Sequence, residues 1–334
     1  MEMKKDSLKR ILFVLWVVVW SYMIPQSIAL AQVTFPTRPV TIWVGFPPGG
    51  GTDIVIRALA DSSEKSLGQK IVIINKPGGG GAVSASLLTK EKPDGYTLAA
   101  FPDTPATRSP HLRDLDYDPF RDLSFIIRVG LWKNAFVVKS DSPFKKWGEV
   151  VEWAKKNPGQ LIFGNPGAGT TPHLAMAKIA ATEGFTFKNV PFAGDTPNVS
   201  ALLGGHIMLG GGSALAWKSH VEAKTMRVLL VFEREGIDYA PDAPTFEKVH
   251  YDFETPTSVI VCAPRGIPDP VRESLEKTFI EGIKTKTFRA VAEKQELLLA
   301  EPFTGKPLND FLKKCYLLYE QIIKEAGIYK MEKK

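Results

Sequence analysis

Short apolar runs alternate with longer segments of helical spacing in the first third of the chain. The run "RPVTIWVGF" alternates apolar side chains and predicts a strand. Residues 53–67 carry apolar positions at helical spacing and stop at Gly68, a residue that often ends helices. "KIVIIN", a helix over residues 82–91 and "PDGYTLAAF" continue the alternation. This order of strands and helices predicts a parallel α/β sheet with right-handed crossovers.

The same order begins again near the middle of the chain. "FIIRVG" and "NAFVV" predict strands, and a helix lined by Trp147 and Ala154 follows. "QLIFGNPGAGTTPHLAMAKIA" is again strand, glycine-rich turn and helix, and "NVPFAG", "HIMLGGG", "MRVLLVF" and "SVIVCAP" predict further strands. The last third predicts helices over residues 270–293 and 309–326. Two similar α/β sets, each with a glycine-rich turn, predict a ligand held between two lobes.

The N-terminus has the pattern of a secretory signal peptide. A basic stretch over residues 4–10 precedes an apolar run over residues 11–20, and Ala29-Leu30-Ala31 follows as a small-x-small cleavage site. The apolar run is shorter than the roughly 20 residues that span a bilayer. We therefore expect residues 1–31 to be removed and the mature protein to begin at Gln32. An uncleaved anchor is the alternative.

Composition narrows the function classes. Of 334 residues, 44% are hydrophobic and 23% are charged, which argues against disorder and against a multi-span membrane protein. The net charge of +6 comes without a basic run interleaved with aromatics, so nucleic acid is not an expected partner. Cys262 and Cys315 lie in apolar patterns and are predicted to be buried side chains rather than nucleophiles or a disulfide framework.

The glycine-rich stretch "VGFPPGGGTD" does not match a known catalytic or phosphate-binding motif. A P-loop needs a lysine after its last glycine, where this chain has Thr52 and Asp53. The dinucleotide fingerprint fails at its sixth position, and no Gly-x-Ser-x-Gly elbow occurs. The histidines show no metal-ligand spacing, so neither a cofactor nor a metal is expected. Asp53 and Asp103 are conceivable as paired carboxylates, but the sequence does not fix their separation.

The remaining interpretation of the glycine-rich turns is that their backbone binds a ligand. Both glycine-rich turns lead into helix N-termini, whose free N–H groups attract an anion such as a carboxylate. Thr52, Thr170 and Thr171 add hydroxyl groups. Asp53 either caps the helix or accepts a hydrogen bond from a ligand amine or bridging water. His173 either orients its loop through a hydrogen bond or acts catalytically, and the first interpretation is favoured because other signs of a triad are sparse.

An ordered set of motifs resembles one known family. The segment "FPTRPVTIWVGFPPGGGTDIVIRALADSSEKSLGQKIVIINKPGGGGAVSASLLTKEKPDGYTL" resembles the opening of the periplasmic solute receptors of tripartite tricarboxylate transporters, often called Bug-type receptors. "LDYDPFRDLSFI", "WAKKNPGQLIFGNPGAGTTPHLAM", "VPFAGDTPNVSALLGGHIML" and "MRVLLVFEREG" continue the resemblance. It covers essentially the whole mature chain.

The resemblance implies an α/β, two-lobed type II periplasmic-binding-protein fold. Each lobe would be a mostly parallel sheet flanked by helices, and crossover strands would form the hinge. Lobe 1 would comprise residues 32–131 plus 254–334, and lobe 2 residues 132–253. The family binds small carboxylates through loop backbone and bridging waters. The positions that match its binding segments are Phe46, Pro47, Gly49, Gly50, Gly51, Thr52, Asp53, Asp103, Thr104, Gly167, Ala168, Gly169, Thr170, Thr171, His173, Phe192, Gly194 and Asp195.

Several positions depart from the family pattern. Asn165-Pro166-Gly167 stands where Ser-Ser-Gly is common, and "PDTPATRSPHL" replaces a Ser/Thr-rich run. A family Tyr-Lys-Gly becomes Phe192-Ala193-Gly194, followed by Asp195. Losing a lysine and gaining Asp103 and Asp195 makes the pocket less favourable to a multiply charged anion. We therefore expect a monocarboxylate, an amino acid or an aromatic acid rather than citrate.

The function expected from this resemblance is that of a periplasmic, monomeric, non-enzymatic receptor. It would deliver a small carboxylate to the membrane subunits of a tripartite tricarboxylate-type transporter. An exported α/β hydrolase acting on a carboxylate is one alternative. A sensor that presents its ligand to the kinase of a two-component system is the other.

Overall fold

The computed structural model describes residues 35–253, 255–299 and 303–330, and Phe35–Lys334 forms one compact unit. The signal peptide predicted over residues 1–31 lies outside the described residues. Within the described ranges, no helix combines the length and the apolar composition that crossing a bilayer requires.

The first sheet has the strand order β11-β4-β10-β3-β1-β2. Its strands are β1 (Val40–Val44), β2 (Ile71–Asn75), β3 (Thr97–Pro102), β4 (Leu123–Trp132), β10 (Ser258–Pro264) and β11 (Leu297–Leu298). β1 pairs in parallel with β2 and β3. β10 pairs antiparallel with both β3 and β4, so the first four strands run one way and β10 and β11 run against them.

The second sheet has the order β7-β6-β8-β5-β9. Its strands are β5 (Asn134–Lys139), β6 (Leu161–Asn165), β7 (Phe187–Pro191), β8 (Leu209–Ser213) and β9 (Met226–Val231). β6 pairs in parallel with β7 and β8, whereas β5 is antiparallel to β8 and β9. Only Lys133 separates β4 from β5. The antiparallel strands β5 and β10 are therefore those by which the chain enters one sheet from the other.

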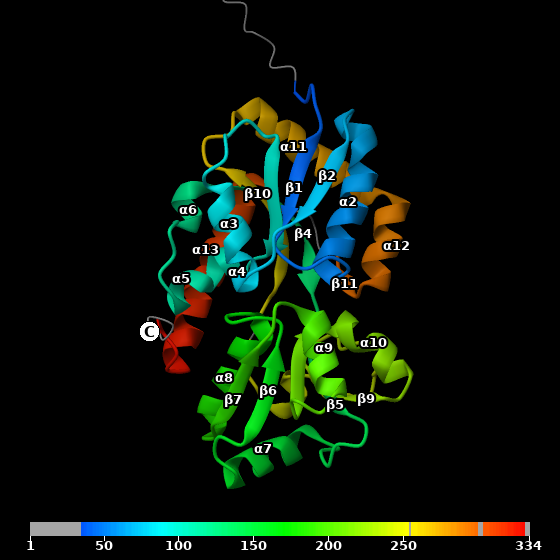
Figure 1. The fold of residues 1–334 in the computed structure, drawn as a ribbon, viewed down its shortest axis with the longest axis vertical. Coiled ribbons are helices and arrows are strands. Elements are labelled where there is room, and N and C mark those ends of the chain that lie inside the picture. The colour runs from blue at the N-terminus through cyan, green and yellow to red at the C-terminus, as the bar shows by residue number, and fades with distance from the viewer. Residues whose placement is uncertain (1–34, 254, 300–302, 331–334) are drawn as a thin grey trace, which may run out of the picture. The chain divides into compact units, whose positions relative to one another are not determined.

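Helices cover both faces of each sheet (Figure 1). On the first sheet, α2 (Gly51–Leu67), α11 (Asp269–Lys284) and α12 (Lys286–Lys294) share one apolar core, and α3 (Ala82–Leu88) and α13 (Gly305–Glu325) share the other. On the second sheet, α7 (Trp147–Lys156) and α8 (Thr171–Glu183) cover one face, and α9 (Asp195–Leu203) and α10 (Ala214–Glu222) the other. Two helix-flanked α/β sheets agree with the predicted fold class.

The helix α2 illustrates how the apolar pattern produces this packing. Val55, Ile56 and Leu59 are fully buried and lie in the same core as the alternate residues of β1. The helix ends where Gly68 adopts a left-handed φ of 75° and donates its N–H to the Glu64 carbonyl oxygen at 2.9 Å. A residue with a β-carbon would be strained in that conformation, so glycine fixes the end of the helix.

Several helices of the fold differ from the sequence prediction. The single helix predicted over residues 270–293 is two helices, α11 and α12. Thr285 interrupts it with an extended ψ of 146°, and its hydroxyl accepts the Phe288 N–H at 3.1 Å, which caps α12. Short helices α4 (Thr104–Thr107), α5 (Ser109–Leu112) and α6 (Pro119–Asp122), and the 3-10 turns η1 (Gly79–Gly81) and η2 (Glu247–Val249), were not predicted.

The two cysteines are free and buried, as predicted. Cys262 lies on β10 and Cys315 on α13, in different apolar clusters. Burial raises the pKa of both thiols, so both stay protonated at neutral pH.

Candidate functional site

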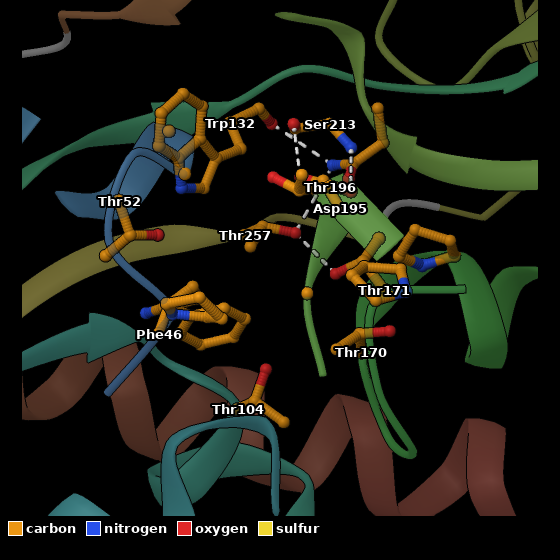
Figure 2. A pocket seen from close by; sticks show the side chains of 18 residues that line it. Phe46, Thr52, Thr104, Trp132, Thr170, Thr171, Asp195, Thr196, Ser213 and Thr257 are labelled. Atoms are coloured by element: carbon orange, nitrogen blue, oxygen red, sulfur yellow. Dashed lines mark hydrogen bonds between the residues drawn. The ribbon is translucent and has the colours of Figure 1, made fainter. Parts of the chain in front are cut away.

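A cavity of about 60 Å³ lies where the glycine-rich turns after β1 and β6 lead into α2 and α8. Figure 2 shows Phe46, Thr52 and Thr104 facing Thr170 and Thr171 across it. The predicted site residues that line this cavity are Phe46, Pro47, Gly50, Gly51, Thr52, Thr104, Thr170, Thr171, Gly194 and Asp195. The structure thus brings together four segments that are far apart in sequence.

Three of the longer helices begin at this cavity. Gly51 and Thr52 open α2, Thr171 opens α8, and Asp195 opens α9, and all four residues line the cavity. The first N–H groups of a helix have no acceptor within the helix and carry partial positive charge. Among the described lining residues there is no lysine, arginine or histidine. The donors that this cavity offers to an anion are therefore uncharged: backbone N–H groups, hydroxyls, the Asn134 amide and the Trp132 indole N–H.

Asp53 lies just outside the lining and holds the first turn in place. Its carboxylate accepts hydrogen bonds from the Gly49 N–H at 2.9 Å, the Asn75 amide at 2.7 Å and the Arg57 guanidinium at 3.0 Å. Burial acts to raise the pKa of Asp53, but these donors outweigh it and the pKa is lowered. The Asn75 amide also donates to the Phe46 carbonyl oxygen at 3.0 Å. All of these bonds fix the loop and none points into the cavity lining.

The second turn is held by its own internal hydrogen bonds. Gly167 donates its N–H to the Asn165 side chain at 3.1 Å, and the Thr170 hydroxyl donates to the Gly167 carbonyl oxygen at 2.7 Å. The Gly169 N–H donates to Nδ1 of His173 at 3.0 Å. His173 therefore lies behind the turn and orients it. Burial lowers the pKa of His173 to about 4, which keeps the ring neutral and able to accept this bond.

The neutral state of the half-buried His173 ring predicts a pH-dependent stability difference. Because the pKa is near 4 when folded and about 6.5 when unfolded, the unfolded chain binds the extra proton first as the pH falls. The H173N variant keeps an acceptor but cannot titrate. Between pH 7 and pH 4.5, the wild type should lose about 1–3 kcal/mol more unfolding free energy than H173N, measured by urea denaturation.

A variant of an exposed histidine provides the control for this experiment. H206N changes an exposed ring and should keep the pH profile of the wild type. Parallel profiles for wild type and H173N would contradict the assignment of His173 as a neutral hydrogen-bond acceptor.

Asp103 does not face the cavity, contrary to the sequence expectation. Its carboxylate is fully buried and forms an ion pair with Arg108 at 2.9 Å. The same guanidinium donates to the Thr104 hydroxyl at 2.9 Å and to the Tyr319 hydroxyl at 2.7 Å. Asp103 thus supports the loop that presents Thr104, and its negative charge is compensated by Arg108.

Other predicted residues also lie outside the lining for structural reasons. The N–H groups of Gly49, Gly167 and Gly169 are used within the turns. Ala168 lies against η1, since a β-carbon on Gly80 would come within 3.4 Å of its carbonyl oxygen. Phe192 packs into the apolar core beneath α9 and α10. These residues shape the turns from behind.

Sequence reasoning missed part of the lining. The additional residues are Pro102, Trp132, Asn134, Pro166, Pro172, Thr196, Ser213 and Thr257. Trp132, Asn134 and Thr257 stand where the chain passes between the two sheets. No glycine-rich motif marks these positions. Their only sequence signal is their place beside strands that enter a new sheet.

Hydrogen bonds connect these crossing segments to the second turn. The hydroxyls of Thr171 and Thr257 are hydrogen-bonded to each other, as Figure 2 shows. The Asn134 amide donates to the Thr257 hydroxyl at 3.4 Å, and the Asn134 N–H donates to the Glu233 carboxyl at 2.8 Å. Burial raises the pKa of Glu233 to about 8. Thr257 therefore links the start of α8 to the segment that enters β10.

Asp195 is the one charged side chain in the described lining. Its carboxylate accepts the Ser213 hydroxyl at 2.6 Å and, more weakly, the Ser213 N–H at 3.4 Å. Its side chain is half-buried, and the loss of solvent around it raises its pKa to about 6. Asp195 is still mostly ionised at neutral pH and adds negative charge to one end of the cavity.

Comparisons with known proteins agree on one family. The profile described as "Tripartite tricarboxylate transporter family receptor" matches residues 55–328. A Cupriavidus necator protein, "UPF0065 protein in gbd 5'region", is 32% identical over 89% of this chain and 90% of its own length. The periplasmic binding protein BugD has a TM-score of 0.80 at 27% identity, covering 89% of this chain and 100% of BugD. An R. palustris protein solved with adipate gives 0.82 at 26% identity, covering 88% and 99%.

Proposed function

Because the chain belongs to the tripartite tricarboxylate transporter receptor family, a family of solute-binding proteins, we propose that it captures a small carboxylate in this cavity and delivers it to membrane transporter subunits. The observation that carries the proposal is the meeting of the N-termini of α2 and α8 at one cavity. Helix N-termini with adjacent hydroxyls suit a carboxylate. The related R. palustris protein was solved with adipate, which supports the same ligand class.

We propose that binding closes two lobes around the ligand. Lobe 1 comprises residues 32–131 and 254–334, and lobe 2 residues 132–253. The chain passes between the sheets from β4 to β5 and from β9 to β10, and short crossings of this kind suit a hinge. The hydrogen bond between the Thr171 and Thr257 hydroxyls joins the two lobes, and Gly194 lies close to Pro47, since a β-carbon on Gly194 would come within 3.3 Å of the proline ring.

We propose that the protein acts in the periplasm, as a monomer and without catalysis. The predicted signal peptide supports export, and the family is one of receptors rather than enzymes. The lining offers hydroxyls from threonines and Ser213, but no histidine among its described members to activate them as nucleophiles. The cavity therefore supplies the groups of a binding site.

The charge of the cavity favours a ligand that is less charged than citrate. Citrate carries three negative charges, which the Asp195 carboxylate would repel. We propose a monocarboxylate skeleton as the ligand.

Calorimetry on refolded, ligand-free protein tests this function. Acetate, propionate, butyrate, benzoate, short amino acids, adipate and citrate form the panel, and at least one of the monocarboxylic or amino acids should bind with micromolar affinity. Low-micromolar binding of citrate would overturn the ligand class. Failure of every acid would overturn carboxylate capture, and conversion of a bound acid, followed by NMR, would overturn the receptor function.

A further inference from the structure

We propose that the ligand carries a positively charged nitrogen in addition to its carboxylate, and that Asp195 binds this nitrogen directly. The ligand class is then a short zwitterionic amino acid. This inference rests on the proposed carboxylate receptor and names its substrate more narrowly. It is carried by the position, the fixed orientation and the missing counter-ion of Asp195.

Asp195 is held rigidly at the wall of the cavity. The hydroxyl of Ser213 donates to its carboxylate at 2.6 Å, and Figure 2 shows this bond at the edge of the pocket. Behind it, a β-carbon on Gly212 would lie only 2.4 Å from Oδ1, so glycine backbone packs directly against the carboxylate. The backbone of β8 therefore closes one side of the carboxylate, and Ser213 fixes its orientation.

No cation of the protein neutralises this carboxylate within the described ranges. None of the ion pairs found there involves Asp195, and no basic side chain lines the cavity. A partly desolvated anion without a counter-ion is unfavourable, and a ligand carboxylate beside it would be repelled. A ligand that brings its own ammonium group removes both penalties.

The two ends of the cavity therefore carry charge of opposite sign. The N-termini of α2 and α8 present partial positive charge through Gly51, Thr52 and Thr171. At the third helix, Asp195 is the first residue of α9, and its carboxylate gives this end of the cavity a negative charge. A dipolar ligand fits this arrangement with its carboxylate towards α2 and α8 and its ammonium towards Asp195. The pKa of Asp195, about 6, leaves the carboxylate ionised at neutral pH and able to make this pair.

Matched ligand pairs test the inference on the wild-type protein. Calorimetry at pH 7.5 compares alanine and β-alanine with propionate, and γ-aminobutyrate with butyrate. At least one amino acid should bind about 30-fold or more tightly than its partner without the amine. If the acids without an amine bind as tightly, the inference is overturned while carboxylate capture stands. If no acid of either kind binds, the proposed function fails and the inference fails with it.

Substitution of Asp195 assigns the effect to this residue. D195N keeps an acceptor for Ser213, and it should weaken amino-acid binding about 30-fold or more while leaving the binding of propionate or butyrate unchanged or tighter. D242N, which removes an exposed acidic side chain, is the matched control and should change neither affinity. Unchanged amino-acid binding in D195N would overturn the role of Asp195. Should D195N not fold, the wild-type pairs alone still decide the inference.

Discussion

The R108M variant should lose about 3–5 kcal/mol of unfolding free energy, measured by urea denaturation at pH 7. Arg108 is fully buried, and its guanidinium bonds to Asp103, Thr104, Tyr319 and the Pro256 carbonyl oxygen. Methionine fills much of the space but removes the guanidinium donors, and only the Pro256 carbonyl oxygen keeps a side-chain donor, the Tyr319 hydroxyl. Burial already raises the pKa of Asp103, and removing Arg108 leaves that carboxyl with no compensating charge.

A double variant and a surface variant complete this test. D103L/R108M replaces the whole pair with apolar side chains and should recover most of the lost stability, because no buried charge remains. R121M breaks the pair between Arg121 and Asp122, in which the arginine is 72% exposed, and should cost less than about 1 kcal/mol. A loss below 1 kcal/mol for R108M itself would contradict the structural role of the buried pair.

The G51V variant should weaken ligand binding about 100-fold, measured by calorimetry with the tightest acid of the panel. Gly51 opens α2 at the cavity wall, and a β-carbon there would already lie 3.0 Å from the Trp132 ring and 3.5 Å from Leu215. Valine adds two further methyl groups. These occupy part of a cavity of only about 60 Å³ and oppose closure against α10.

The G148V variant is the control for this substitution. Gly148 is the second residue of α7, and a β-carbon there meets no atom within 4 Å. Valine at this position should leave affinity unchanged, and both variants should retain the far-UV circular dichroism of the wild type. Binding by G51V within fivefold of the wild type would contradict the placement of the ligand at the start of α2.

The turns of the site were predictable because backbone conformation and motif coincide there. Gly49 and Gly169 have φ values of 75° and 76°, which glycine adopts without strain, so the runs of glycine in the sequence marked true turns at the carboxyl ends of strands. Thr52 and Thr171 follow these turns at helix starts and line the cavity. Local sequence was sufficient for this half of the site.

The remaining half depends on contacts between distant segments. Asp103 and Thr104 are neighbours in sequence, yet only Thr104 reaches the cavity, because Arg108 binds Asp103 on the other side and is itself bonded to Tyr319. Thr257 joins the lining only because β10 is placed beside β4. Such pairings have no local pattern that a sequence reading can detect.

The sequence pattern did not predict the break between α11 and α12, and the reason differs from that for the site residues. The nearest glycine, Gly282, lies within α11 three residues before Thr285, and the surrounding "KTKTF" continues a helical pattern. The hydroxyl cap at Thr285 stops one helix and starts the next, and Phe288 then packs into the core of the first sheet. Tertiary packing selected the break over the continuous helix that local propensity allows.

The insertion of β10 between β3 and β4 also sets an order of assembly for the chain. The strands of the second sheet are contiguous from Asn134 to Val231, so they can pair soon after they emerge. The first sheet must wait for Ser258–Pro264, and its pairings with β3 and β4 close long loops, which slows folding. Until then β3 and β4 each present an unpaired edge that can recruit another chain. In a chain that emerges N-terminus first, the second sheet is therefore completed first, and the arrival of β10 ends the exposure of those edges.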